Sequence, residues 1–228
     1  MKRRGFEICI AVLLFVGLII TPAIGCVAEA SDTNKVAVYF WDLTGDRAVK
    51  KVLEFTQSDW AAFKNQVKEI RTTSTSIEES LNAQFALFKE RGIISYDMTY
   101  ETLKDRAEER FKDRHYRQPR APLKAGNVII NAICAINFEL TNGSTFVFGL
   151  NTFINLVGFD IISFHKGYSP DGVNTMGGLL HQSTSSGEHI GSMFGLLGYW
   201  FGTKTGTGTY SDLIVAGFTV GTFWLKLS

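Results

Sequence analysis

The feature that most constrains this chain is a change of composition near residue 125. From Ser31 to Ala125 the chain holds 17 Lys or Arg and 15 Asp or Glu residues, whereas from Gly126 to Ser228 it holds 3 and 5. The second stretch also contains 17 of the 22 glycines. A stretch with so few charges buries most of its surface, contacts a membrane or binds a partner. We therefore expect a charged helical part followed by an apolar β part.

The N-terminus has the order of a secretory signal. Basic residues at positions 2–4 precede an apolar run from Ile8 to Ile20, and Ala28 and Ala30 are the small residues that a signal peptidase reads. This pattern predicts a signal peptide over residues 1–30. The remaining chain is then secreted or held at the cell surface.

Two alternatives share the same N-terminus. The run from Ile8 to Ala28 has no charge and is long enough to span a bilayer, so it could stay in place as a signal-anchor. Cys26 follows small residues, as in a lipoprotein cleavage site, and is a candidate for lipidation. All three interpretations place residues 31–228 outside the cytoplasmic membrane.

Charge and cysteine content limit the partners of the exported part. Residues 31–228 carry equal numbers of basic and acidic side chains, so we expect no nucleic-acid partner. Cys134 is the one cysteine after Ser31, which argues against a disulfide framework.

Residues 31–122 predict one strand followed by three helices. The strand covers 36–41, a β-branched and aromatic run. The first helix starts at Ser58, and the second starts at a capping box formed by Ser76 and Glu79 and ends at Gly92. The third covers about 99–114. The apolar positions expected to face inward are Trp60, Phe63, Val67, Ile70, Ile77, Leu81, Phe85, Phe88, Leu103, Ala107 and Phe111.

Residues 123–228 predict an antiparallel β domain after a proline-containing linker at 118–122. Alternation from Val128 to Leu140 places Val128 and Ile130 inward, with Asn131, Asn137 and Glu139 on the exposed face. The sequence predicts a hairpin that pairs this strand with 144–156 through a three-residue loop, Thr141 to Gly143, in which Gly143 is left-handed. Further strands are expected at 160–165, 176–182, 188–202 and 210–226.

The expected fold is therefore α+β. It is mainly an antiparallel β-sandwich or barrel-like meander of about six or seven strands, most of them in the C-terminal half, with the three-helix segment after the first strand. Residues 1–30, 31–122 and 123–228 are the expected segments.

One group of side chains could bind a metal ion. Asp160, His165, His181, Glu188 and His189 all lie near expected turns of the β part, where imidazoles and carboxylates could hold a metal with Glu188 as a base. The spacing matches no metalloenzyme motif, and no nucleophile motif is present, so the sequence gives no catalytic residue and no cofactor.

A second group of residues could form a binding surface that has no catalytic role. Tyr199, Trp200 and Phe201 lie in an aromatic stretch that is either a core strand, which we favour, or an exposed platform for glycan or lipid.

These patterns leave three hypotheses for function. The favoured one is an exported, non-enzymatic, envelope-associated or secreted protein that acts by binding or as a structural component, through self-association or contact with envelope lipid or glycan. The second is a secreted metal-dependent hydrolase that uses the histidine and glutamate group. The third is an integral membrane component with helices in the C-terminal half.

Overall fold

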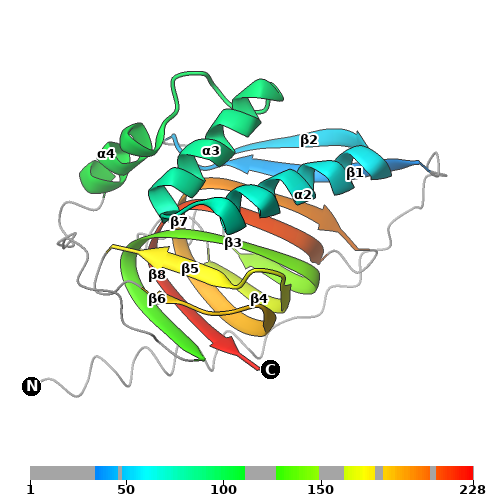
Figure 1. Cartoon of the computed structure of the whole chain (residues 1–228). Coiled ribbons are helices and arrows are strands. Elements are labelled where there is room, and N and C mark those ends of the chain that lie inside the picture. Colours follow the sequence, from blue (N-terminus) through cyan, green and yellow to red (C-terminus); the bar gives the residue numbers. More distant parts are fainter. Residues whose placement is uncertain are drawn as a thin grey trace, which may run out of the picture. The chain divides into compact units, whose positions relative to one another are not determined.

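The computed structural model describes residues 34–45, 48–110, 127–148, 162–177, 182–205 and 209–227. These residues form an α+β fold of eight strands and three helices (Figure 1). The strands are β1 (Lys35–Asp42), β2 (Val49–Thr56), β3 (Val128–Phe148), β4 (Ile162–Ser169), β5 (Val173–Met176), β6 (Gln182–Ser183), β7 (Gly187–Lys204) and β8 (Tyr210–Lys226). The helices are α2 (Gln57–Thr73), α3 (Ile77–Glu90) and α4 (Tyr100–Arg110).

The strands form one antiparallel sheet. Its order is β2-β1-β7-β4-β3-β5-β6, and β8 pairs with both β3 and β7. This confirms the α+β class and the antiparallel pairing, but it does not confirm the expected β-sandwich or barrel-like meander. A meander pairs strands that follow one another in the chain, whereas here β1 pairs with β7 and β3 pairs with β8.

The position of the helices also differs from the prediction, because they follow a second strand and not the first. β2 was missed since Lys50 and Lys51 interrupt its apolar alternation. It pairs with β1 alone among the described strands. Charged side chains of this kind are common on edge strands, where lysine hinders pairing with another chain.

The helices begin at capping residues and bury the expected stripes. The Thr56 hydroxyl, not that of Ser58, caps α2 by accepting from the Asp59 amide at 3.1 Å. Ser76 caps α3 in the same way, accepting from the Glu79 amide at 3.0 Å, while the Glu79 carboxylate accepts from the Thr75 amide. Gly92 has a φ of +66°, as expected for a left-handed cap.

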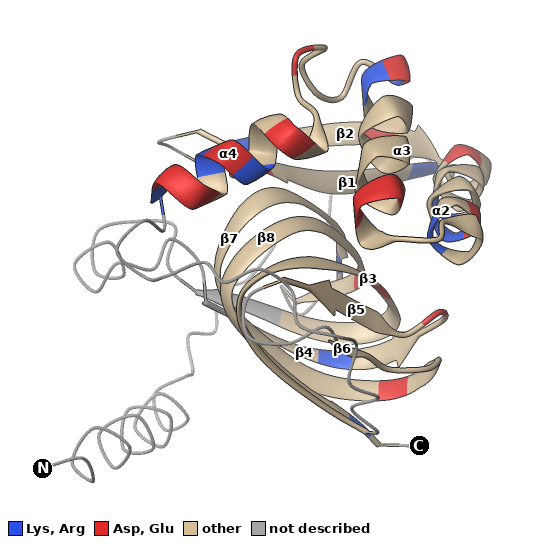
Figure 2. Ribbon diagram, turned by 60° about the vertical axis from the view of Figure 1, so that its left-hand side comes forward, with Lys and Arg blue, Asp and Glu red and all other residues tan. Residues whose placement is uncertain are grey.

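The apolar stripes of the helices pack on the sheet in a first core. It contains Val38, Phe40, Trp60, Phe63, Val67, Ile77, Leu81, Phe85, Phe88, Leu103, Ala107, Tyr199, Phe201, Ile214 and Phe218, with Ile70 packed against it. Phe111 lies outside the described residues. The second core contains no helical residue: Leu43, Ile129, Ile136, Phe138, Leu140, Val173, Met193, Leu196, Trp200, Tyr210, Leu213, Val215 and Trp224 form it. The sheet therefore curves strongly enough to enclose this core by itself (Figure 2).

A line of irregular residues crosses the three longest strands. Ile133 of β3 and Gly195 of β7 have φ values of 51° and 60°, and both lie beside Val220 of β8, where the regular pairing is interrupted. A left-handed residue within a strand changes which side the following side chains face. We call this line the bend of the sheet.

The bend explains where the alternation of β3 was predicted wrongly. Cys134, Ile136, Phe138 and Leu140 are buried as expected, but before the bend the phase is reversed, so Val128 and Ile130 are exposed while Ile129 is buried. Asn131, Asn137 and Glu139, which were expected on an exposed face, are also buried. For Asn137 and Glu139 the reason is that α2 and α3 contact this face of the strand.

The predicted hairpin at Thr141 to Gly143 is not formed. β3 runs through these residues and pairs with β4, with an irregularity between Thr141 and Ser144. Asn142, not Gly143, has the positive φ, of 51°. Gly143 is needed because a Cβ there would lie 2.7 Å from the carbonyl oxygen of Lys166. The segment 149–156 of the expected second strand lies outside the described residues.

A buried ion-pair cluster ties the helices to the sheet. The Arg71 guanidinium of α2 donates to the Glu139 carboxylate of β3 at 2.7 Å and to the Asp171 carboxylate, after β4, at 2.7 and 2.9 Å. Both Arg71 and Glu139 are almost fully buried. Burial raises the pKa of Glu139, and the Arg71 charge opposes that shift. Removing the arginine would therefore leave a buried carboxylate without its cation.

We expect Arg71→Met to lower the free energy of unfolding by about 3–5 kcal/mol, because a buried charge loses its partner. Lys35→Met is the control, since Lys35 and Glu54 form an exposed pair at 3.6 Å, and should change it by about 1 kcal/mol or less. Urea unfolding of residues 31–228 measures both. Equal midpoints for the two variants would show that the cluster does not hold the layers together.

Two glycines of β8 provide a matched test of the close approach between β7 and β8. A Cβ at Gly217 would lie 2.4 Å from the Leu197 carbonyl oxygen, whereas at Gly221 the nearest atom is 3.7 Å away. Gly217→Ala should therefore lower the free energy of unfolding by about 1–3 kcal/mol, and Gly221→Ala should stay within about 1 kcal/mol of wild type. Thermal and urea unfolding of the two variants provide the measurement, and a more stable Gly217→Ala would contradict this packing.

Candidate functional site

His165 is part of the core of the sheet. Its ring stacks on Trp224 with 5.1 Å between ring centroids, and it hydrogen-bonds the Ser163 hydroxyl at 2.7 Å and the Thr145 hydroxyl at 3.2 Å. Burial lowers its pKa to about 3, so the ring is neutral at physiological pH. Both ring nitrogens are engaged with hydroxyl groups inside the protein.

His189 is also buried, with both ring nitrogens in use. Its Nδ1 is 2.9 Å from the carbonyl oxygen of Gly187 and its Nε2 is 2.7 Å from the Thr184 hydroxyl. Because a carbonyl can only accept, Nδ1 carries the proton and Nε2 accepts from the hydroxyl. Burial is the main cause that lowers the pKa of this ring. The lone pair that a metal would need is already occupied.

Strand alternation separates the residues of the predicted metal group. Glu188 is exposed, whereas His189, the next residue of β7, is buried, since neighbouring side chains of a strand face opposite sides. Within the described residues, no group of three or more His, Cys, Asp or Glu side chains could hold a metal ion. Asp160 and His181 lie outside the described residues, so a site that includes them stays a prediction.

The aromatic residues Tyr199, Trp200 and Phe201 are core residues. Tyr199 and Phe201 pack under the helices and Trp200 faces the second core, and each is at most 2% exposed. They cannot serve as a surface platform in this arrangement. Cys134 is buried and burial raises the pKa of its thiol, while Cys26 lies outside the described residues. Among the described helices, none combines the length and apolar character needed to cross a bilayer.

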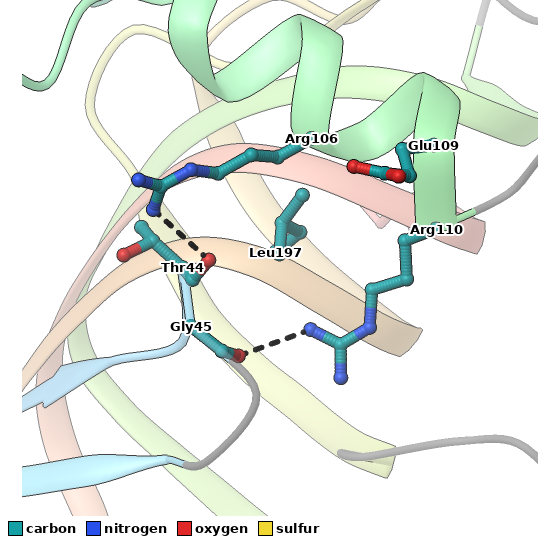
Figure 3. A pocket seen from close by; sticks show the side chains of 6 residues that line it. All are labelled: Thr44, Gly45, Arg106, Glu109, Arg110 and Leu197. Carbon is teal, nitrogen blue, oxygen red and sulfur yellow. Dashed lines mark hydrogen bonds between the residues drawn. The ribbon is translucent and has the colours of Figure 1, made fainter.

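A pocket of about 540 Å³ lies between α4 and the turn after β1 (Figure 3). Its lining residues are Thr44, Gly45, Arg106, Glu109, Arg110 and Leu197. Arg106 and Arg110 lie on successive turns of α4. The Arg106 guanidinium donates to the carbonyl oxygen of Thr44 and the Arg110 guanidinium to that of Gly45, both at 3.3 Å. These contacts fasten α4 to the end of β1, and Glu109 offsets part of the positive charge. We therefore regard this pocket as a contact between elements that supports the fold.

The more unusual surface is an exposed apolar face formed by four neighbouring strands. Direct pairing places Val128, Leu225, Ile190 and Lys166 in one row, and Ile130, Phe223, Ser192 and Phe164 in the next. Residues directly opposite in antiparallel strands face the same side of a sheet. We call this surface the outer face, defined by Val128, Ile130, Tyr168, Ile190, Phe223 and Leu225, with Lys166 and Glu188 at its margin.

Most side chains of the outer face are exposed, and Leu225 is half-buried. Ile130 is 60% exposed, Tyr168 47%, Ile190 42%, Phe223 40% and Val128 38%, and Leu227 next to them is 47% exposed. The alternate residues Ile129, Met193 and Trp224 of the same strands lie in the second core. The strands are thus apolar on both sides, and only one side is covered by the described part of the chain. Figure 2 shows how few charged positions these strands carry in comparison with the helices.

The sequence at the end of β8 contains a signal for this face. Phe223, Leu225 and Leu227 alternate with Trp224 and Lys226 at the end of β8, so one apolar set had to face outward. The position of the bend, which decides the phase, was not visible in that pattern.

Comparisons with protein-family models, curated proteins and solved structures show no significant match to this chain.

Proposed function

We propose that this is an exported, non-enzymatic protein that acts by association, and that it associates with a second copy of itself through the outer face. The observation that carries this proposal is the group of neighbouring apolar side chains exposed across β3, β8, β7 and β4. Scattered apolar residues are common on protein surfaces, but contiguous ones usually mark a contact site.

The charges at the margin favour a second copy over a membrane. Lys166 lies directly opposite Ile190, and Glu188 lies directly opposite Tyr168, so one cation and one anion flank the apolar rows. A two-fold interface uses the same patch twice, and each Lys166 can then meet the Glu188 of the other copy. A surface built for anionic lipid would instead have a basic margin.

Burial of the exposed apolar side chains can supply enough free energy for such a contact. Fully burying an exposed Val, Leu, Ile or Phe side chain stabilises by about 1.5–3 kcal/mol, and half-exposed side chains contribute correspondingly less. Several side chains acting together offset the cost of association, provided that the two surfaces fit.

The proposed location is the cell envelope or the medium, reached through the N-terminal segment of residues 1–30. The pattern of basic residues, an apolar run and small residues supports it. Sequencing the N-terminus of the protein recovered from cells tests this part: Ser31 indicates cleavage, and an intact Met1 in the membrane fraction indicates a signal-anchor.

We expect single charge reversals at the margin to weaken the homodimer and their mixture to restore it. Lys166→Glu and Glu188→Lys each place like charges together in a two-fold contact, whereas a mixed dimer of the two variants regains opposite charges. Analytical ultracentrifugation of residues 31–228 at low ionic strength, where screening is weak, measures the three samples. The matched controls are Lys68→Glu and Glu69→Lys on the exposed side of α2.

Four results would contradict the proposal. Wild-type protein that stays monomeric at high concentration would show that no homodimer forms. Charge reversals that leave dimerisation unchanged would show that the outer face is not the interface. Co-sedimentation of monomers with lipid vesicles, lost in Phe223→Ser, would assign the face to lipid and favour the membrane alternative. Stoichiometric zinc in the same samples, lost in His181→Ala, would support the alternative of a metal-dependent hydrolase.

A further inference from the structure

A second surface, distant in sequence from the outer face, combines aromatic rings with lysines. In β1 the side chains of Val38 and Phe40 pack under the helices, so Tyr39 and Trp41 face the other side of the sheet, where both are half-buried. Lys50 of β2 lies directly opposite Trp41. Its Nζ is 4.9 Å from the centre of the Tyr39 ring and 5.2 Å from the centre of the Trp41 ring.

The second lysine approaches the same ring from another strand. Lys204 lies at the end of β7, and its Nζ is 4.7 Å from the centre of the Tyr39 ring and 5.6 Å from that of Tyr210. Tyr39 and Tyr210 meet edge to face, with 5.8 Å between their centroids. The residues therefore make a continuous aromatic surface that carries two ammonium groups.

Glycine at position 202 is required for this arrangement. Gly202 pairs with Tyr39, and a Cβ there would lie 2.8 Å from the Trp200 ring and 3.0 Å from the Tyr210 ring. A larger residue would crowd the Trp200 and Tyr210 rings.

The ammonium groups of Lys50 and Lys204 lie 4.9 and 4.7 Å from the centre of the same Tyr39 ring. Neither has an ion pair with a carboxylate in the described part of the chain. The pKa of Lys50 is lowered, first by partial burial and then by the charge of Lys204. Contacts with aromatic rings compensate for this repulsion only in part, since an exposed cation–π contact contributes about 0.5–1 kcal/mol. An anion placed between the lysines would relieve the repulsion directly.

We propose that Tyr39, Trp41, Lys50 and Lys204 form a binding site for an anionic sugar. The two aromatic rings contact the apolar face of the sugar ring, and the two ammonium groups bind its carboxylate, sulfate or phosphate. Tyr and Trp rings have apolar faces and one polar group at the edge, so they suit a sugar, which also has apolar and polar sides. The site is independent of the self-association proposed above, because it uses none of the residues of the outer face.

Isothermal titration calorimetry with a galacturonic acid tetramer tests the site, with a neutral galactose tetramer and inorganic sulfate as comparison ligands. We expect the acidic tetramer to bind at least tenfold more tightly than either. The double variant Lys50→Gln/Lys204→Gln should weaken its binding at least tenfold, and Trp41→Leu should weaken the tetramer more than sulfate. Lys51→Gln is the matched control, because Lys51 is the neighbouring lysine of β2 and lies opposite Phe40, on the other side of the strand.

Several outcomes would overturn the proposal. Wild-type protein that does not bind the acidic tetramer at millimolar concentration lacks the site. If wild type and the double lysine variant bind the acidic tetramer with equal affinity, the tetramer binds at another place on the protein. Sulfate that binds as tightly as the tetramer shows that the aromatic rings do not contact a sugar. Circular dichroism of each variant verifies that the fold is intact.

Discussion

The bend across β3, β8 and β7 determines the rest of this structure. At Ile133 and Gly195 the backbone adopts left-handed φ values, and Val220 lies between them. A β-branched residue at positive φ is costly, so the surrounding structure must hold Ile133 in place. On one side of the bend, each long strand packs one face under the helices and turns the other face to the second core, whereas on the other side only the inner face reaches that core. The outer face exists because the strands beyond the bend have apolar side chains on both sides and the described helices cover neither.

Elements with strong local signals could be predicted from the sequence. The capping residues Ser76 and Glu79, the stripes of α2 and α3, and the lengths of β7 and β8 agree with the structure. Their causes lie within a few residues of chain, as hydroxyl caps and periodic apolar positions do. The expected strand 36–41 corresponds to β1, and 160–165 overlaps β4.

Features that depend on distant contacts could not be predicted. Thr141-Asn142-Gly143 suits a hairpin turn and a strand irregularity equally well, and the choice depends on β4, whose Gly167 lies against Gly143. Glu139 was expected in solvent, but Arg71 and the helices cover it. The outer face was missed for the same reason: Val128 and Ile130 have the correct alternation for a core strand, and the bend turns them outward. Glu188 and His189 were expected to act together in a metal site. As adjacent residues of one strand they face opposite sides of the sheet, so they cannot.

Disulfide trapping can show whether the outer face joins two copies. Cys134 is buried, so in residues 31–228 a cysteine introduced at the surface is the reactive one. Ile190 lies between Leu225 and Lys166 at the middle of the outer face, and Tyr96, which is 81% exposed, lies in the loop after α3. We expect Ile190→Cys to form a covalent dimer rapidly on mild oxidation at micromolar concentration, and Tyr96→Cys not to do so. Equal or slower dimer formation by Ile190→Cys would contradict this expectation.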